Sequence, residues 1–266
     1  MSGSHGDGHG DGLHVPGHTV VHHVPAHAAL LGVVAFVLVV VATPATEPLA
    51  YAGYALLLGA AVVLAGLAPA LVLKRMVVEV PFVVFALLVP FVAAGPRVEV
   101  LGVAVSQPGL VDAGALLAKA TLGVVAAIVL SATQHPRALL RGLSRLRVPD
   151  LVVTIAGFMF RYTQVVLDEM RRMRVAREAR GFEATSVRQA KVLAQSAGAL
   201  FIRSYERGER VHLAMLSRGW DGAMPALTDL RRETVRRGAW LPAAVLPLAA
   251  LAVLTVQLTT SWGLAP

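Results

Sequence analysis

The stretch LAYAGYALLLGAAVVLAGLAPALVL, residues Leu49–Leu73, decides the fold of this 266-residue chain. Its 25 residues include no Asp, Glu, Lys, Arg or His. A helix of about 20 apolar residues is long enough to cross the roughly 30 Å hydrocarbon core of a bilayer. The stretch is followed at once by Lys74 and Arg75, which are typical of the cytoplasmic end of a span. It therefore predicts a membrane-spanning helix.

Four more apolar runs repeat this pattern along the chain. They are Val24–Pro44, Val80–Pro96, Ala113–Thr133 and Ala239–Pro266. Hydrophobic residues make up 56% of the sequence and charged residues 15%, whereas soluble domains average roughly 45–50% and 25%. We therefore predict an all-α integral membrane helical bundle with about five transmembrane helices. Leu101–Leu110 is expected to be an interfacial loop, and Lys119 is expected to extend its side chain to the lipid headgroups.

The charged residues are concentrated in one block, residues 134–238. This block holds 20 of the 24 Lys and Arg residues and 10 of the 16 Asp and Glu residues, which gives it a local net charge of +10. The rest of the chain is nearly uncharged and suits lipid. We therefore divide the chain into a His-rich tail (1–23), four spans (24–133), an Arg-rich cytoplasmic coupling domain (134–238) and a final span (239–266).

The placement of basic residues predicts the orientation in the membrane. Both connections expected on the side of the N-terminus, at Lys74-Arg75 and after Thr133, are basic. The opposite connections, Ala45–Pro48 and Arg97–Asp112, contain a single basic residue between them. We expect a multi-pass protein of the plasma membrane, with a cytoplasmic N-terminus and an external C-terminus.

Several kinds of chemistry are excluded by what the sequence lacks. It has no cysteine, which excludes thiolate catalysis and cysteine-ligated metal sites. The Gly-x-x-x-x-Gly-Lys-Ser/Thr motif that cradles ATP phosphates is absent. No Ser–His–Asp set or paired-carboxylate site stands out. We therefore expect a protein that is not an enzyme and binds no cofactor of its own, so that ATP and Mg would act on partner subunits.

Two long amphipathic helices are predicted in the cytoplasmic block. In the first, apolar residues recur in steps of three and four from Ile155 to Met173. Asp150 is placed to cap its N-terminus, and Gly181 is placed to end it in a left-handed conformation. The second helix covers about 187–218 and also stops at a glycine.

The two predicted helices end in the same way, in a small residue, an arginine and a glycine. The triplets are Ala179-Arg180-Gly181 and Ser217-Arg218-Gly219. Either triplet alone fits a structural role, because Arg favours the helix dipole and Gly terminates helices. Two copies point to function, because an Arg at a rigid helix tip presents a planar fork of donors to carboxylates on a partner.

Further polar residues on the second helix support these tips. They are Arg203, Glu206, Arg207 and Arg210. Glu206 and Arg210 are four residues apart, so they lie on one face of the helix and are expected to pair. Such a pair adds only a few tenths of a kcal/mol to a solvated helix.

The segments around the triplets resemble a known family. RSYERGER at Arg203–Arg210 and MLSRGWDG at Met215–Gly222 are similar to the signature of the T component of energy-coupling factor (ECF) transporters, in the cobalt branch usually called CbiQ. Met159–Tyr162 and Asp168–Arg171 resemble the preceding part of the same family. The resemblance implies a membrane scaffold that joins two cytoplasmic ABC ATPase subunits to a small membrane substrate-binding subunit.

The resemblance also implies roles for individual residues. Arg180 and Arg218 would end two coupling helices and pair with acidic residues of the ATPases. Ser217 replaces the alanine of the family pattern, and because serine is nearly as small, docking is expected to survive. The transported substrate would be cobalt or nickel ions.

The N-terminal tail is a candidate metal-binding segment. Its histidines are His5, His9, His14, His18, His22 and His23, and they are interleaved with Asp7 and Asp11. Imidazole and carboxylate ligands suit nickel, copper or cobalt. A polar leader with incidental histidines explains the same composition, so both interpretations stay open.

Other functions also remain open. The chain could be an ordinary ABC permease subunit that lines the substrate path itself, or a scaffold for a vitamin rather than a metal. A third class is a membrane-tethered module whose Arg block binds nucleic acid or anionic lipid. Acidic residues interleaved through 134–238 disfavour this class, and we expect no nucleic-acid partner.

Overall fold

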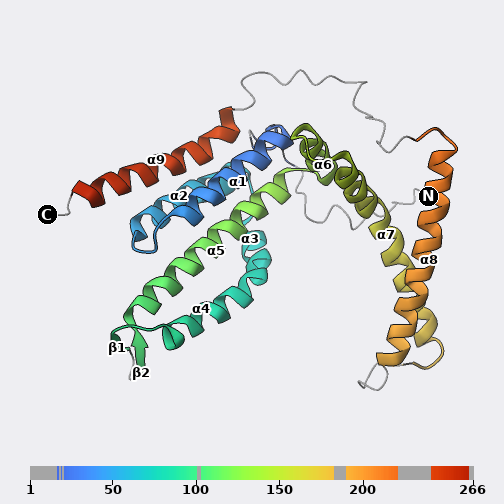
Figure 1. Ribbon diagram of the computed structural model, residues 1–266, viewed down its shortest axis with the longest axis horizontal. Helices are drawn as coiled ribbons and strands as arrows, with labels where there is room; N and C mark the ends of the chain where they lie inside the picture. Colours follow the sequence, from blue (N-terminus) through green and yellow to red (C-terminus); the bar gives the residue numbers. More distant parts are fainter. Residues whose placement is uncertain are drawn as a thin grey trace. The chain divides into compact units, whose positions relative to one another are not determined.

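The computed structural model describes residues 17, 19, 21–100, 103–182, 190–220 and 241–263. The described part of the chain is almost entirely helical, which confirms the predicted all-α bundle (Figure 1). Its elements are α1 (Ala26–Ala42), α2 (Pro48–Leu64), α3 (Pro69–Arg75), the short 3₁₀ helix η2 (Met76–Glu79), α4 (Val80–Val92), β1 (Arg97–Val100), β2 (Val103–Ser106), α5 (Gln107–Thr133), α6 (Pro136–Arg145), α7 (Asp150–Glu178), α8 (Ala190–Leu216) and α9 (Leu241–Gly263).

The helices belong to two compact units. The membrane unit contains α1 to α5 and α9, and the α7–α8 unit contains the two longest amphipathic helices. The boundary falls inside α6, after Gly142. Each unit is therefore described by itself.

The apolar run that predicted the membrane fold is not one helix. α2 ends where Gly66 adopts a left-handed conformation with φ +67°. The amide of Leu67 then donates to the carbonyl of Val62 at 3.2 Å, and Pro69 starts the next helix. The third apolar helical segment is consequently Pro69–Val92, formed by α3, η2 and α4. The expectation that Lys74-Arg75 lies between two spans was wrong, because Gly66 turns the chain before this pair.

The first half of α7 is more apolar than expected for a cytoplasmic helix. By length and composition, Asp150–Glu178 joins Pro69–Val92 and Gln107–Thr133 as one of three helices able to cross a membrane in the described part of the chain. α1, α2 and much of α9 are shorter apolar helices. Charge is unevenly placed along α7, because Arg161 is the only charged residue between Asp150 and Asp168. The first half is therefore suited to apolar surroundings and the second half to water.

A small hairpin replaces part of the expected interfacial loop. β1 and β2 pair antiparallel, with Arg97 opposite Ser106 and Val100 opposite Val103. Ser106 then caps α5, since its Oγ accepts from the amide of Gly109 at 3.3 Å. The cap makes α5 begin at Gln107, several residues before the predicted span.

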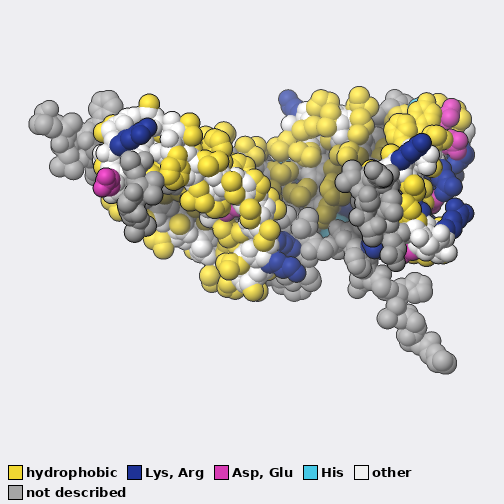
Figure 2. Space-filling view, turned by 90° about the horizontal axis from the view of Figure 1, so that it is seen from below, with side chains coloured by type: hydrophobic (Ala, Val, Ile, Leu, Met, Phe, Trp, Pro, Cys, Tyr) yellow, Lys and Arg dark blue, Asp and Glu magenta, His cyan; other side chains and the backbone are white. Residues whose placement is uncertain are grey.

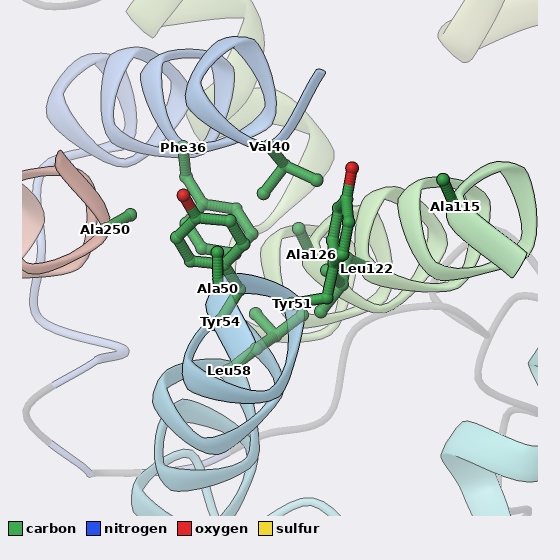
Figure 3. Close-up of a cluster of buried hydrophobic side chains, with 10 residues drawn as sticks. All are labelled: Phe36, Val40, Ala50, Tyr51, Tyr54, Leu58, Ala115, Leu122, Ala126 and Ala250. Carbon is green, nitrogen blue, oxygen red and sulfur yellow. The ribbon is translucent and has the colours of Figure 1, made fainter. Parts of the chain in front are cut away.

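The core of the membrane unit lies where α1, α2, α5 and α9 meet. Its largest fully buried side chains are Phe36, Tyr54 and Leu58. Figure 3 shows Phe36 reaching from α1 toward the ring of Tyr54, and the two rings pack edge to face with centroids 6.2 Å apart. The hydroxyl of Tyr54 shares a 3.0 Å hydrogen bond with Thr43, and that of Tyr51 donates to the carbonyl of Thr43 at 3.1 Å. The polar ends of both tyrosines are thus satisfied inside the bundle.

Two charged side chains in the membrane unit also have partners within the chain. The ammonium of Lys119 donates to the carbonyl of Val41 at 2.9 Å, in the last turn of α1, where a cation favours the helix dipole. This contact gives the lysine a backbone acceptor at the end of α1 instead of the lipid contact expected. Glu79 is buried and accepts a hydrogen bond from the hydroxyl of Thr121 in α5.

Glycine permits the closest helix crossing in this core. α9 lies beside α1 and α2 (Figure 1). A Cβ at Gly32 would lie 2.6 Å from the carbonyl oxygen of Ala243, which is closer than real Cβ atoms approach. The first and last helices therefore pack backbone to backbone at this point.

We expect Gly32→Ala to weaken the contact between α1 and α9, because the added methyl group meets a backbone atom that has little freedom to move. Overpacking of this kind typically costs about 1–3 kcal/mol. The matched control is Gly59→Ala in α2, where a Cβ meets nothing within 4 Å. Thermal unfolding in detergent should show a lower Tm for Gly32→Ala and an unchanged or higher Tm for Gly59→Ala. Equal Tm values for the two variants would contradict this account of the crossing.

Candidate functional site

The two helices of the α7–α8 unit are long, with 29 residues in α7 and 27 in α8. α7 starts directly after Pro149, which is its N-cap, so the prediction that Asp150 caps the helix was wrong. Asp150 is instead the first helical residue and makes no capping hydrogen bond. Its carboxylate still lies in the first turn, where negative charge favours the dipole.

The C-terminal end of α7 confirms the predicted left-handed glycine. Gly181 has φ +72°, a conformation that side chains other than glycine's rarely adopt. The amide of Phe182 donates to the carbonyl of Arg177 at 3.1 Å, and that of Gly181 donates to Glu178 at 2.9 Å. This pair of bonds is the Schellman motif, which closes the last turn of a helix. Arg180 is the residue directly before the turn.

The C-terminal end of α8 repeats this geometry. Gly219 has φ +81°, the amide of Trp220 donates to Met215 at 3.0 Å, and that of Gly219 donates to Leu216 at 2.9 Å. Arg218 therefore occupies the same position at the tip of α8 as Arg180 does at the tip of α7. The two triplets singled out in the sequence are two copies of one backbone structure.

Sequence reasoning missed the aromatic residues that follow each glycine. Phe182 and Trp220 are half-buried. The ring of Trp220 packs edge to face on His212 of α8, eight residues earlier in the chain, with centroids 5.6 Å apart. A hydrophobic residue at this position normally contacts the last turn in a Schellman motif, which is the signal that could have found both.

The serine that departs from the family pattern is used inside its own helix. The hydroxyl of Ser217 donates to the carbonyl of Ala214 at 3.0 Å. Its only polar group is thus directed back along α8. Ser217 therefore presents a surface close to that of alanine.

The two arginines at the helix tips, Arg180 and Arg218, are exposed. Within the part of the chain that the structure describes, neither Arg180 nor Arg218 has an ion pair or a side-chain hydrogen bond. By contrast, Arg174 in the same last turns of α7 donates to Glu178 at 2.7 Å. That hydrogen bond raises the pKa of Arg174 above its usual value. The guanidinium groups at the tips are thus available to a partner.

An ion pair joins the two helices away from their tips. Arg203 of α8 donates to Glu169 of α7 at 2.5 Å, and Arg172 lies 3.8 Å from the other oxygen of the same carboxylate. The side chain of Glu169 is only 18% exposed, so this pair is better shielded from water than the other ion pairs of the unit. Arg203 is therefore an internal contact between α7 and α8.

The other supporting residues have weaker contacts. The predicted pair of Glu206 and Arg210 is present, but its 4.0 Å separation is at the limit for an ion pair. Arg207 is half-buried and has no ion pair with another described residue. Within the described part of the chain, these residues make no ion pair that fixes the helix ends at Arg180 and Arg218.

Much of α8 lacks cover within the described residues, where none of its side chains is buried. Large apolar side chains on it are exposed, namely Leu193, Phe201, Ile202, Tyr205, Leu213 and Leu216. In Figure 2, charged side chains of both signs gather on the right, over the α7–α8 unit, beside hydrophobic ones. Soluble helices seldom leave so much apolar surface exposed, so α8 has the character of a docking surface.

The histidine tail gives no structural site. His5, His9, His14 and His18 lie outside the described residues. His22 is described, and its Nδ1 shares a 2.7 Å hydrogen bond with Thr19, while His23 is exposed. Among the described residues, no group of three or more His, Asp or Glu side chains is placed to hold a metal ion. Metal binding by the tail stays a prediction.

Comparison with known proteins points to one family. Residues 17–228 match the family model of CbiQ, described as a cobalt transport protein. The cobalt transport protein CbiQ of Rhodobacter capsulatus is 31% identical over 127 residues, which are 48% of this chain and 52% of that protein. The energy-coupling factor transporter transmembrane protein EcfT of Limosilactobacillus fermentum is 27% identical over 164 residues, 58% of this chain and 59% of that protein.

A third relative is an uncharacterized protein of Methanocaldococcus jannaschii, 29% identical over 150 residues, 56% of each chain. The match thus spans between half and three fifths of the length of these three relatives. The family match includes both helix ends described above.

We expect Gly181→Ala and Gly219→Ala to loosen the helix tips, because a left-handed backbone costs a residue with a Cβ about 1–2 kcal/mol. The matched controls are Gly198→Ala and Gly208→Ala inside α8, where a Cβ meets nothing within 4 Å and the backbone is helical. Hydrogen exchange of the last turn should speed up several-fold in the first two variants. The controls should exchange at the wild-type rate or more slowly. An unchanged exchange rate at both tips would mean that the left-handed glycines do not stabilise the last turns of α7 and α8.

We expect Glu169→Gln to loosen the contact between α7 and α8, because it removes the charge that holds Arg203. A pair of this kind contributes up to about 1 kcal/mol. The control is Glu206→Gln, which removes a carboxylate 4.0 Å from its partner. A double-mutant cycle with Arg203→Gln should give a coupling energy for Glu169 that is clearly larger than the one for Glu206 with Arg210→Gln. Two equal coupling energies would show that the pair of Glu169 and Arg203 does not stabilise the contact between α7 and α8.

Proposed function

This chain belongs to the CbiQ family of cobalt transport proteins, and from this membership we propose that it is the membrane scaffold of an ECF-type importer. As such it would couple two cytoplasmic ABC ATPase subunits to a small membrane subunit that binds the substrate. The transported substrate would be cobalt or nickel ions.

The observation that carries this proposal is the matched pair of helix tips. Arg180 and Arg218 stand at equivalent positions of two Schellman motifs, and both are exposed without a partner among the described residues. Two equal tips fit two equal partners, as a pair of ATPase subunits would provide. A planar guanidinium on a rigid backbone suits a carboxylate that accepts two parallel hydrogen bonds.

The proposed mechanism uses the stiffness of the two helices. ATP and Mg would bind to the partner ATPases, since this sequence has no phosphate-binding loop. Closing and opening of the ATPase pair would move the two tips, and a packed helix transmits such motion along its length instead of bending. This motion would displace the two coupling helices relative to one another, about the contact that Glu169 makes with Arg203.

The remaining assignments extend this proposal. The N-terminus would be cytoplasmic and the C-terminus external in the plasma membrane, as the basic block that follows Thr133 predicts. The histidine tail would then hold metal on the cytoplasmic side. A scaffold for a vitamin would keep the same tips and differ only in the substrate-binding partner.

We expect the double variant Arg180→Glu/Arg218→Glu to lose the ATPases while remaining in the membrane, because each glutamate places a negative charge opposite partner carboxylates. Breaking a buried charge pair at an interface typically costs about 2–5 kcal/mol, so recovery should fall by at least about tenfold. The measurement is purification in mild detergent from native membranes, with identification of every co-purifying protein by mass spectrometry.

The matched control is Arg161→Glu/Lys191→Glu. These two side chains are exposed, lie on the same two helices and make no ion pair with described residues. The control should retain the ATPases. Equal retention by both double variants would exclude the tips as docking points. An ATPase pair recovered without any small membrane protein would favour an ordinary permease.

A further inference from the structure

Helix α6 lies against the ends of two apolar helices. It follows the end of α5 after two residues, Gln134 and His135. The side chain amide of Gln134 donates to the carbonyl of Val24, just before α1 begins, at 3.2 Å. Gly142 of α6 sits against the first turn of α1, where a Cβ would lie 2.9 Å from the amide nitrogen of His27. This part of α6 therefore crosses the start of α1 beside the end of α5.

This position is at the boundary between hydrocarbon and water. α5 carries no charged residue between Lys119 and its end at Thr133, and α1 carries none beyond His27. After Lys119 the next charged residue is Arg137, which follows Gln134 and His135. A short helix packed on these ends thus lies at the height of lipid headgroups.

The two faces of α6 are chemically different. Leu139, Leu140 and Leu143 are half-buried. Arginines recur at every fourth residue, a spacing that keeps them on one side of a helix, and all of them are exposed. They are Arg137, Arg141 and Arg145. α6 is therefore amphipathic in the sense of helices that lie in a membrane surface.

The positive charge of α6 is not balanced within the chain. Residues 136–148 contain four arginines and no Asp or Glu. None of these arginines has an ion pair with a described residue. In α7 and α8, by contrast, arginines alternate with carboxylates and several are paired. The positive charge on the arginine face of α6 is thus available to an anion from outside the chain.

The fourth arginine stands where glycine is favoured. Arg147 has φ +61°, and the bonds from Arg147 to Ser144 and from Val148 to Leu143 form the same Schellman pattern as at α7 and α8. Glycine fills this position at the ends of α2, α7 and α8. An arginine held in a strained conformation points to a use for its side chain.

We propose that α6 is a binding site for the phosphate groups of anionic phospholipids, formed by Arg137, Arg141, Arg145 and Arg147. The guanidinium groups donate paired hydrogen bonds to phosphate oxygens, and the half-buried leucines occupy the other face of the helix. Because the site lies at headgroup height, lipid phosphate reaches it without entering the aqueous phase. This inference does not depend on docking of ATPases.

The experiment is a lipid titration of the purified full chain by native mass spectrometry. The probe is dioleoyl phosphatidylglycerol, with dioleoyl phosphatidylcholine as the neutral comparison. The test variant is Arg137→Gln/Arg141→Gln/Arg145→Gln, and the matched control Arg171→Gln/Arg172→Gln/Arg174→Gln removes the same charge from α7. We expect the test variant to bind phosphatidylglycerol at least about tenfold more weakly and the control to stay within about twofold of wild type.

Arg147→Gly separates binding from folding. Glycine adopts φ +61° freely, so this variant should keep or raise the Tm of the wild type while losing phosphatidylglycerol affinity. Unchanged affinity in both the triple variant and Arg147→Gly would overturn the proposal. Equal losses in the test and control variants would also overturn it, since net charge alone would then explain them.

Two further outcomes identify a different ligand. If inorganic phosphate competes with phosphatidylglycerol, the site takes free anions and the lipid assignment is wrong. If the triple variant keeps phosphatidylglycerol but loses co-purifying ATPases, the arginine face of α6 is a protein docking surface.

Discussion

The structure depends on one constraint: polar groups that are removed from water must find partners within the chain. In the membrane unit this constraint fixes how the spans are arranged. Tyr51 and Tyr54 hold the carbonyl and hydroxyl of Thr43, so the end of α1 is bound to α2. The ammonium of Lys119 donates to another carbonyl of the same helix end, and the hydroxyl of Thr121, two residues further along α5, donates to Glu79 of η2. Hydrogen bonds of this kind hold side chains from separate spans in register, while the surrounding apolar contacts leave register less defined.

The same constraint shapes the ends of the helices in the α7–α8 unit. The last carbonyls of a helix have no partner in regular helical geometry, and a left-handed residue brings two later amides back to them. At α7 and α8 that residue is glycine, and the arginine before it is fixed by backbone bonds on both sides. The position of the arginine that we propose for docking is thus a consequence of how the helix ends. An exposed side chain on a loop would have no comparable restraint.

The features that sequence could predict are those set by neighbours in the chain. The left-handed ends at Gly181 and Gly219 follow from local residues, as do the apolar helices themselves. Hydropathy could not locate the break at Gly66, because a hydropathy average does not distinguish a glycine that continues a helix from one that ends it. The pair of Glu169 and Arg203 joins residues far apart in sequence, so its geometry depends on the packing of two helices. Composition records Arg147 only as a positive charge, because it carries no information on the left-handed backbone conformation of this residue.

The close crossing at Gly32 and Ala243 has a consequence for biosynthesis. It joins the first helix of the membrane unit to the last, and everything between them in the chain, including α7 and α8, leaves the ribosome before α9. During translation, the surface of α1 and α2 that later contacts α9 is therefore covered only by lipid or by the insertion machinery. The contact of α9 with α1 and α2 forms last, and a nascent chain released before α9 is made would expose this surface to quality-control proteases.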